Sequence, residues 1–203
     1  MSFVIFDTEY TSWKGCQEHG WHGTHKKEIV QIAALKVSDE LEVLVEFNQL
    51  CQPKINPVLS DYFVNLTHIQ NEDIQREGAP FEKAFANFRA FVGKDICFSH
   101  GWGADYYHKS DGAIIDENLE LNHLSQKNDL TYYNVAAIFK ELYQKNNIDI
   151  KSQASGEIAT LLGIEDELSD LHLKPHDALY DVYSIYAGLC HFKEDALKLL
   201  KKR

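Results

Sequence analysis

The chain has few cysteines and no long apolar run, and these absences exclude several classes of protein. Its four cysteines, Cys16, Cys51, Cys97 and Cys190, contain no CxxC pair and form no dense framework. Without a secretory signal pattern, this usage predicts reduced thiols in a cytoplasmic protein. The longest apolar runs are far shorter than a membrane span requires, so we expect no membrane partner.

Basic residues are scarce relative to acidic ones. The chain has 20 Lys and Arg against 31 Asp and Glu, which gives a formal net charge of -11. This balance argues against a protein that coats DNA or membranes through bulk charge. A phosphate-bearing substrate remains compatible with it if metal ions lie between the protein and the phosphate.

Length and composition are typical of a globular domain. The chain has 203 residues, of which 44% are hydrophobic and 25% are charged. A chain of this size buries a substantial core. The sequence has no internal repeat, no low-complexity tract and no shift in composition that would mark a boundary, so we expect one domain over residues 1–203.

The hydrophobic pattern predicts three strands followed by helices that alternate with further strands. FVIF (3–6), IVQIAALKV (29–37) and VLVEFNQLC (43–51) are typical strands, close enough in sequence to form an antiparallel meander. Helices are expected over residues 80–94, 130–144, 155–164 and 176–192, and a short strand over 95–102. The pattern therefore predicts an α/β fold, a mixed β-sheet flanked by α-helices.

Two carboxylates follow the first predicted strand. Asp7 and Glu9 lie two residues apart, so on an extended chain their side chains point to the same face. Such charges repel unless water solvates them or a cation shares them, and Mg²⁺ is a hard cation that takes carboxylate oxygens. A D-x-E pair alone is usually a pair of surface acids. Asp105 lies just beyond the predicted strand 95–102, however, and His176 and Asp181 open the last predicted helix.

Taken in order, D-x-E, then D, then H-x4-D resembles the DEDDh family of 3′-5′ exonucleases, which share a ribonuclease-H-like fold. The matching residues are Asp7 and Glu9 in FDTEY, Asp105 in GADYY, and His176 with Asp181 in HDALYD. The strand and helix order also fits the family, so the resemblance covers essentially the whole chain. It implies a single exonuclease domain with a sheet of the ribonuclease-H type, an antiparallel three-strand meander plus parallel strands.

Two further features concern the branch of the family and one departure from its pattern. The segment PKINPVLSDYFVNLTHIQNEDI is similar to the Eri-type and KapD-like branch, whose members carry an L-S-D…L-T-x-I stretch there. Many members of the family have a small or polar residue and a phenylalanine before the second-motif aspartate. Here Gly103 and Ala104 precede Asp105, and Asp111 is the alternative for this position.

The resemblance implies a two-metal-ion mechanism with Mg²⁺ or Mn²⁺. In that mechanism Asp7, Glu9 and Asp181 hold the ion that binds the attacking water, Asp7 bridges to the second ion, and Asp105 completes the second site. His176 is the expected general base, because histidine side chains titrate close to neutral pH. The implied activity releases nucleoside 5′-monophosphates from the 3′ end of single-stranded RNA or DNA.

Three residues are candidates for substrate binding. Tyr10 and Trp13 follow the D-x-E pair, where the family usually has an apolar or aromatic wall against the last base. Ordinary packing is an equally good explanation for both. Lys174 precedes His176 and either meets a phosphate or is an exposed residue before the helix.

The stretch CQEHGWHGTHKK holds a second group of potential ligands. Cys16, His19, His22 and His25 recur at every third position, and these residue types bind zinc. The stretch also contains two glycines, and Cys16 is its one cysteine, so it has no cysteine pair of the kind that structural zinc sites use. These features favour a loop beside the active site over a structural zinc. In such a loop Trp21, Lys26 and Lys27 are expected to contact the substrate strand.

Two other functions share many of these features. One is a nucleic-acid-binding module that keeps the fold without turnover, but the presence of all five catalytic matches argues against it. The other is a ribonuclease-H-like endonuclease, and such enzymes generally lack the H-x4-D arrangement. The sequence therefore favours a 3′-5′ exonuclease.

Overall fold

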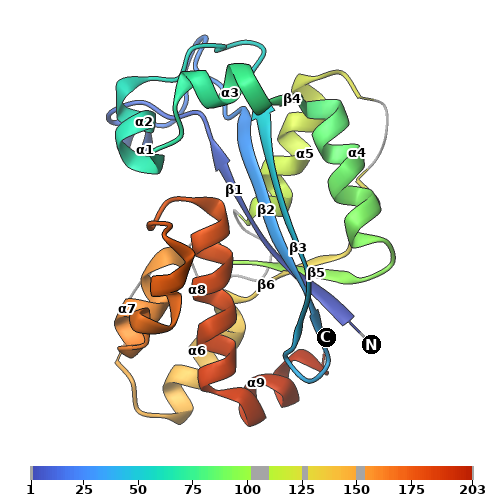
Figure 1. Ribbon diagram of the computed structural model, residues 1–203, viewed down its shortest axis with the longest axis vertical. Helices are drawn as coiled ribbons and strands as arrows, with labels where there is room; N and C mark the ends of the chain where they lie inside the picture. The colour runs from blue at the N-terminus through green and yellow to red at the C-terminus, as the bar shows by residue number, and fades with distance from the viewer. Residues whose placement is uncertain (1, 102–109, 125–127, 150–153, 203) are drawn as a thin grey trace.

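A six-stranded mixed sheet forms the centre of the molecule (Figure 1). The computed structural model describes residues 2–101, 110–124, 128–149 and 154–202. The strands are β1 (Ser2–Tyr10), β2 (Ile29–Ser38), β3 (Val43–Gln52), β4 (Ala79–Pro80), β5 (Ile96–Ser99) and β6 (Tyr132–Asn134). They are arranged in the order β4-β3-β2-β1-β5-β6, so the strand that carries Asp7 and Glu9 lies inside the sheet.

Helices cover both faces of this sheet. They are α1 (Cys16–His19), α2 (Asp61–Thr67), α3 (Asn71–Glu77), α4 (Phe81–Val92), α5 (Asp111–Leu121), α6 (Ala136–Lys145), α7 (Ile158–Leu162), α8 (Ala178–His191) and α9 (Lys193–Leu200), with 3₁₀ turns η1 (Ser155–Glu157) and η2 (Glu165–Leu171). Figure 1 shows α4 and α5 on one side of the sheet and α6 to α9 on the other. The short helices α2 and α3 lie beyond the end at which β1 finishes.

The predicted antiparallel meander is confirmed. β1 pairs antiparallel with β2, from Ser2 opposite Ser38 to Tyr10 opposite Ile29, and β2 pairs antiparallel with β3. On its other side β1 pairs in parallel with β5, and β5 with β6. Parallel pairing requires helical crossovers that cover the sheet, which explains why β1 begins with a continuous apolar run rather than an alternating one.

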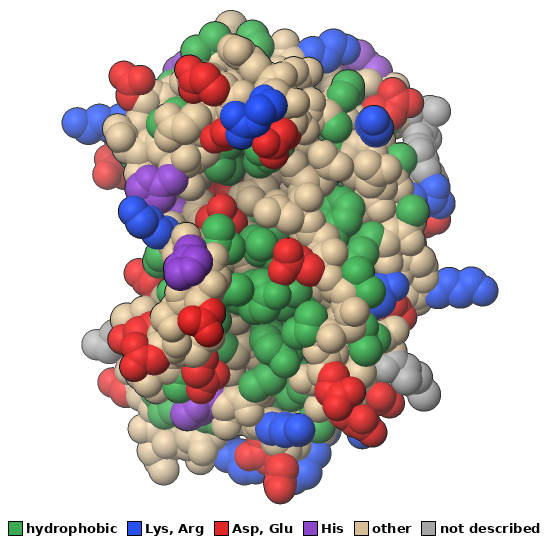
Figure 2. All heavy atoms as spheres, in the orientation of Figure 1, with side chains coloured by type: hydrophobic (Ala, Val, Ile, Leu, Met, Phe, Trp, Pro, Cys, Tyr) green, Lys and Arg blue, Asp and Glu red, His purple; other side chains and the backbone are tan. Residues whose placement is uncertain are grey.

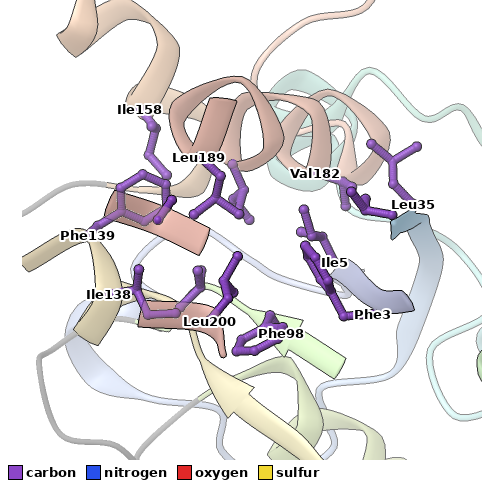
Figure 3. Close-up of a cluster of buried hydrophobic side chains, with 14 of the residues drawn as sticks. Phe3, Ile5, Leu35, Phe98, Ile138, Phe139, Ile158, Val182, Leu189 and Leu200 are labelled. Carbon is purple, nitrogen blue, oxygen red and sulfur yellow. The ribbon is translucent and has the colours of Figure 1, made fainter. Parts of the chain in front are cut away.

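The core between the sheet and α8 fixes the relation between β1 and the C-terminal helices. Figure 3 shows this cluster. Its labelled side chains come from the sheet (Phe3, Ile5, Leu35 and Phe98) and from helices α6 to α9 (Ile138, Phe139, Ile158, Val182, Leu189 and Leu200). Full burial of each such side chain stabilises the fold by roughly 1.5–3 kcal/mol. Since β1 and α8 share this core, the first turn of α8 is held beside the end of β1.

Two segments differ from the sequence-based prediction. The prediction of one helix over 130–144 is wrong at its start, because Tyr132–Asn134 pair in parallel with Cys97–Ser99 as β6, and the helix begins only at Ala136. Neighbouring aromatic residues favour a strand where a partner supplies the backbone hydrogen bonds. The predicted helix over 155–164 is a 3₁₀ turn followed by the short α7.

The outer strand β3 exposes apolar side chains. Val43, Leu44 and Val45 are exposed there, and Figure 2 shows hydrophobic side chains gathered in the middle of the face on which β3 lies. β4 covers only Cys51 and Gln52 of this strand. Within the described parts of the chain, no helix combines the length and apolar character needed to cross a membrane.

Candidate active site

Four predicted site residues converge at the end of β1. Asp7 is 6% exposed and Glu9 is half-buried, and both come from this strand. Asp181 lies in the first turn of α8 and is 4% exposed, and His176 lies just before that helix. One ligand atom from each of Glu9, His176 and Asp181 lies within 4.8 Å of the other two. Glu9 therefore meets two residues that follow it by 167 and 172 positions in the sequence.

The start of α8 is tied to the sheet beside Glu9. Asp177 caps the helix, since its side chain accepts a hydrogen bond of 2.9 Å from the Leu179 N–H. Gln31 of β2, which lies opposite Glu9 in the sheet, donates to Asp177 Oδ1 (3.2 Å) and accepts from the Ala178 N–H (3.0 Å). The sequence pattern did not identify Gln31, which holds the helix start in place.

His176 occupies an unusual backbone position. Its φ of 69° lies in the left-handed region, which a non-glycine residue adopts at some cost. Its N–H donates to Asp181 Oδ1 at 3.2 Å, and this contact offsets part of that cost. The side chain is exposed, so the imidazole lies at the mouth of the carboxylate cluster and is accessible to water.

A fourth carboxylate belongs to Asp111, the first residue of α5. Asp111 is 7% exposed, and its Oδ1 accepts hydrogen bonds from the Thr8 N–H (3.0 Å) and the Thr8 hydroxyl (2.6 Å). Thr8 stands between Asp7 and Glu9, so these bonds hold Asp111 against the D-x-E segment. The predicted second-motif residue, Asp105, lies outside the described residues.

The helix that carries Asp111 is fixed at two points. The Asn118 side chain accepts from the Ile29 N–H (2.9 Å) and donates to the Lys27 carbonyl (2.8 Å), which ties α5 to the start of β2. At the other end, a Cβ added to Gly112 would overlap the Tyr132 ring, so only glycine permits this approach. The position of Asp111 therefore depends on contacts with both β2 and β6.

The four carboxylates are held in an environment that disfavours their charges. Burial, followed by the charges of Asp111 and Asp181, raises the pKa of Asp7 well above its usual value. Partial burial and the same two charges raise the pKa of Glu9. Burial also raises the pKa of Asp111 and of Asp181 to about 6. Among the described residues, none of the ion pairs with Lys or Arg includes any of these four acids.

This donor set fits a hard divalent cation. Mg²⁺ and Mn²⁺ take carboxylate oxygens, and a cation offsets the mutual repulsion of acids that are buried together. Glu9, His176 and Asp181 are the described residues whose ligand atoms meet closely enough to share an ion. The cluster therefore has the chemistry of a metal site.

The raised pKa values predict how the stability of the metal-free protein changes with pH. In the folded protein the carboxyls of Asp111 and Asp181 prefer their neutral forms, so their contribution to stability is fully present below about pH 4 and is lost as pH rises through about 6. Asp111→Asn keeps an oxygen for both Thr8 donors and removes the charge. In EDTA we expect the free energy of unfolding of this variant to exceed that of wild type by about 1–2 kcal/mol at pH 7.5 and to equal it at pH 4. Urea unfolding at both pH values measures this difference.

The matched control for that comparison is Asp116→Asn, on the same helix. Asp116 is exposed, and its carboxylate accepts a hydrogen bond from the Tyr132 hydroxyl. Its substitution should not raise the free energy of unfolding above that of wild type at pH 7.5. An Asp111→Asn variant that is less stable than wild type at both pH values would contradict the predicted repulsion.

The aromatic residues beside Glu9 form two pairs. Tyr10 lies 5.7 Å from Trp21 between ring centroids, and Lys27 Nζ lies 4.7 Å from the Trp21 centroid. Trp13 stacks on His25 at 4.0 Å. The predicted base-stacking residues therefore already have ring partners in the protein. Burial, followed by the charges of nearby Asp111 and Glu9, raises the pKa of Tyr10, so the end of β1 places this ring close to the carboxylates.

The predicted ligands of that loop are mostly separate from one another. Cys16 is buried, whereas His19, His22 and His25 are exposed. Cys16 and these histidines are absent from the group of described side chains that meet closely enough for a metal. Lys174, the predicted phosphate contact, is exposed before α8, and its carbonyl accepts from the Asp177 N–H.

The structure combines an α/β fold with a group of acids and a histidine, at the end of β1, whose ligand atoms lie close enough together to hold a metal ion. The RNase_T family model, described as an exonuclease, matches residues 4–189. The chain therefore belongs to this exonuclease family. The resemblance to the exonuclease family and the predicted ribonuclease-H-like fold are both confirmed.

Two curated relatives match part of the chain. The ERI1 exoribonuclease 2 of Xenopus laevis is 33% identical over 93 residues, and that of Homo sapiens is 26% identical over 92 residues. Each match covers 45% of this chain and 12% of the relative, so the matched region is a small part of those proteins.

Solved structures match nearly the whole chain. Cell-death related nuclease 4 (CRN-4) has a TM-score of 0.71 at 19% identity, over 95% of this chain and 64% of that one. The nuclease domain of 3′hExo, a DEDDh family member bound to rAMP, has a TM-score of 0.66 at 19% identity, over 99% and 92%. E. coli Exonuclease I with a dT13 oligonucleotide has a TM-score of 0.70 at 16% identity, over 99% and 43%. These matches show the fold.

Proposed function

We propose that this site removes nucleotides one at a time from the 3′ end of single-stranded RNA or DNA and releases nucleoside 5′-monophosphates. The observation that carries the proposal is the meeting of Glu9, His176 and Asp181 beside Asp7 and Asp111. None of these four acids forms an ion pair with a described Lys or Arg. The proposed cofactors are two Mg²⁺ or Mn²⁺ ions. When bound, they supply Lewis-acid activation of water and neutralise charge on the phosphate.

Each residue has a role in this proposal. Asp7, Glu9 and Asp181 hold one cation, and Asp7 together with the second-motif acid holds the other. The His176 ring accepts a proton from the attacking water, a role that its exposed position beside Glu9 and Asp181 permits. Tyr10 and Trp13 contact the terminal base, and Lys174 contacts a phosphate.

The substrate class is supported by what similar proteins carry in their structures. E. coli Exonuclease I was solved with dT13, and another neighbour is described as a 3′-exonuclease that recognises the 3′ end of a histone mRNA stem-loop. The proposal further includes a single exonuclease domain over residues 1–203 and a cytoplasmic location. The four cysteines are free thiols, which supports a reducing compartment.

The direct test is a nuclease assay on end-labelled single strands. A 5′-labelled RNA and a matched DNA should shorten in single-nucleotide steps with Mg²⁺ or Mn²⁺ and remain intact in EDTA. A 3′-blocked strand and a circular strand should survive. Cleavage of the circle would indicate an endonuclease, and binding without cleavage would indicate a non-catalytic module.

The second-motif acid is a separate prediction. We propose Asp111 for this role, because it is buried, bonded to Thr8 and close enough to Asp7 to raise its pKa. Asp111→Asn should lower the rate by at least about 10²-fold, as expected for loss of a charged metal ligand. Asp105→Asn should then retain most activity.

Rates for both variants at saturating Mg²⁺, with Asp116→Asn as the control on α5, distinguish the two assignments. An inactive Asp105→Asn beside an active Asp111→Asn would assign the second motif to Asp105 and leave the other roles unchanged.

A further inference from the structure

We propose that Ser155 and Gly156 are positioning residues that set the orientation of the Asp181 carboxylate and its spacing from Asp7. Both belong to η1, the 3₁₀ turn before α7. The sequence resemblance assigned them no role. The inference deepens the proposed function, because its metal-binding readout rests on the cation site described above.

The Ser155 hydroxyl lies between two acids of the cluster. Its Oγ is 2.8 Å from Asp181 Oδ2 and 3.4 Å from Asp7 Oδ1. Ser155 is 9% exposed, so water has little access to replace it. A hydroxyl has one proton to donate, and the shorter distance assigns it mainly to Asp181. The oxygen therefore holds two repelling carboxylates at a defined separation, with a charge-assisted bond to one of them.

Gly156 limits Asp181 from the other side. A Cβ added to Gly156 would overlap Asp181 Oδ1, so the carboxylate keeps its position only if this residue has no side chain. The same Oδ1 accepts the His176 N–H at 3.2 Å. Each oxygen of Asp181 thus has one protein donor, and each retains a lone pair for a cation.

The turn itself is firmly attached to α8. The Ala159 N–H donates to Ser184 Oγ at 3.1 Å, and Ile158 belongs to the core cluster shown in Figure 3. A Cβ on Gly188 of α8 would overlap the Ile158 side chain, which shows how closely the two segments approach. Since the core fixes Ile158, Ser155 and Gly156 have a fixed position relative to Asp181.

The test measures Mn²⁺ affinity by calorimetry without nucleic acid. Partners that orient a ligand typically contribute 10- to 100-fold to metal affinity, so Ser155→Ala and Gly156→Ala should each bind Mn²⁺ roughly 10–100-fold more weakly than wild type. Ser184→Ala is the matched control, since it removes a buried hydroxyl from the same α7–α8 contact without touching a carboxylate. It should lower the melting temperature and leave Mn²⁺ affinity unchanged.

Two results would overturn the inference. One is wild-type Mn²⁺ affinity in both Ser155→Ala and Gly156→Ala, each shown to be folded by near-UV circular dichroism. The other is an equal loss of affinity in Ser184→Ala, which would make the effect a general loosening of the α7–α8 contact.

A double-mutant cycle in EDTA separates this inference from the proposed function. Ser155→Ala should lower the urea midpoint in wild type and have a smaller effect in an Asp181→Ala background, because the carboxylate it contacts is absent. Such coupling in a protein that neither degrades nucleic acid nor binds Mn²⁺ would reject the proposed function and keep the contact. Additive effects would reject the positioning role, whether or not the wild type is a nuclease.

Discussion

Asp7→Asn is expected to abolish nuclease activity and leave the fold intact. Asp7 lies at the centre of the cluster, since the charges of Asp111, Asp181 and Glu9 all raise its pKa. The amide is nearly the same shape as the carboxylate but lacks the charge that a hard cation requires. Because Asp7 is buried among like charges, the metal-free variant should be at least as stable as wild type at neutral pH.

The measurement combines turnover with metal-induced stabilisation. At a Mg²⁺ concentration about 100 times its dissociation constant, binding should raise the melting temperature of wild type by roughly 5–10 °C. Asp7→Asn should lose most of this rise together with its activity, whereas Asp116→Asn should retain both. A metal-free Asp7→Asn protein that melts several degrees below wild type would indicate that Asp7 supports the fold rather than the chemistry.

The part of the site that could be predicted from the sequence depends on local spacing. Asp7 and Glu9 share a face because a strand has a period of two, and His176 precedes Asp181 by little more than one helical turn. The amphipathic pattern of α4 and the apolar runs of β1 and β2 were also sufficient to predict these elements. Each of these signals lies within a short window of residues.

The rest depends on contacts between distant segments. Asp111 is bonded to a residue 103 positions away, and its helix is held there by contacts of Asn118 with the start of β2 and of Gly112 with Tyr132. The sequence around Ser155 is typical of an ordinary turn before a helix. Its contact with Asp7 joins residues that are 148 positions apart in the chain. β6 was missed for the same reason, because its strand conformation depends on β5 as a partner.

Substitution of His176 is expected to separate general-base catalysis from metal binding. If the ring accepts the proton of the attacking water, its loss should lower turnover by roughly 10²–10⁴-fold. A general base acts only in its unprotonated form, so activity of wild type should rise with pH, and the variant should lack this rise. Mg²⁺ affinity should change little, because the carboxylates hold the cation.

The backbone at this position determines which variant gives a clear answer. Because φ of His176 is 69°, alanine introduces strain that asparagine largely avoids, so His176→Asn should be measured beside His176→Ala. His172→Ala is the matched control, since His172 is also exposed, has a φ of 54° and lies in the same connecting segment. If His176→Asn requires much more Mg²⁺ yet recovers the full rate at saturation, the ring is a ligand and another group accepts the proton. A rate that stays low at saturating Mg²⁺, with unchanged affinity, assigns the proton transfer to His176.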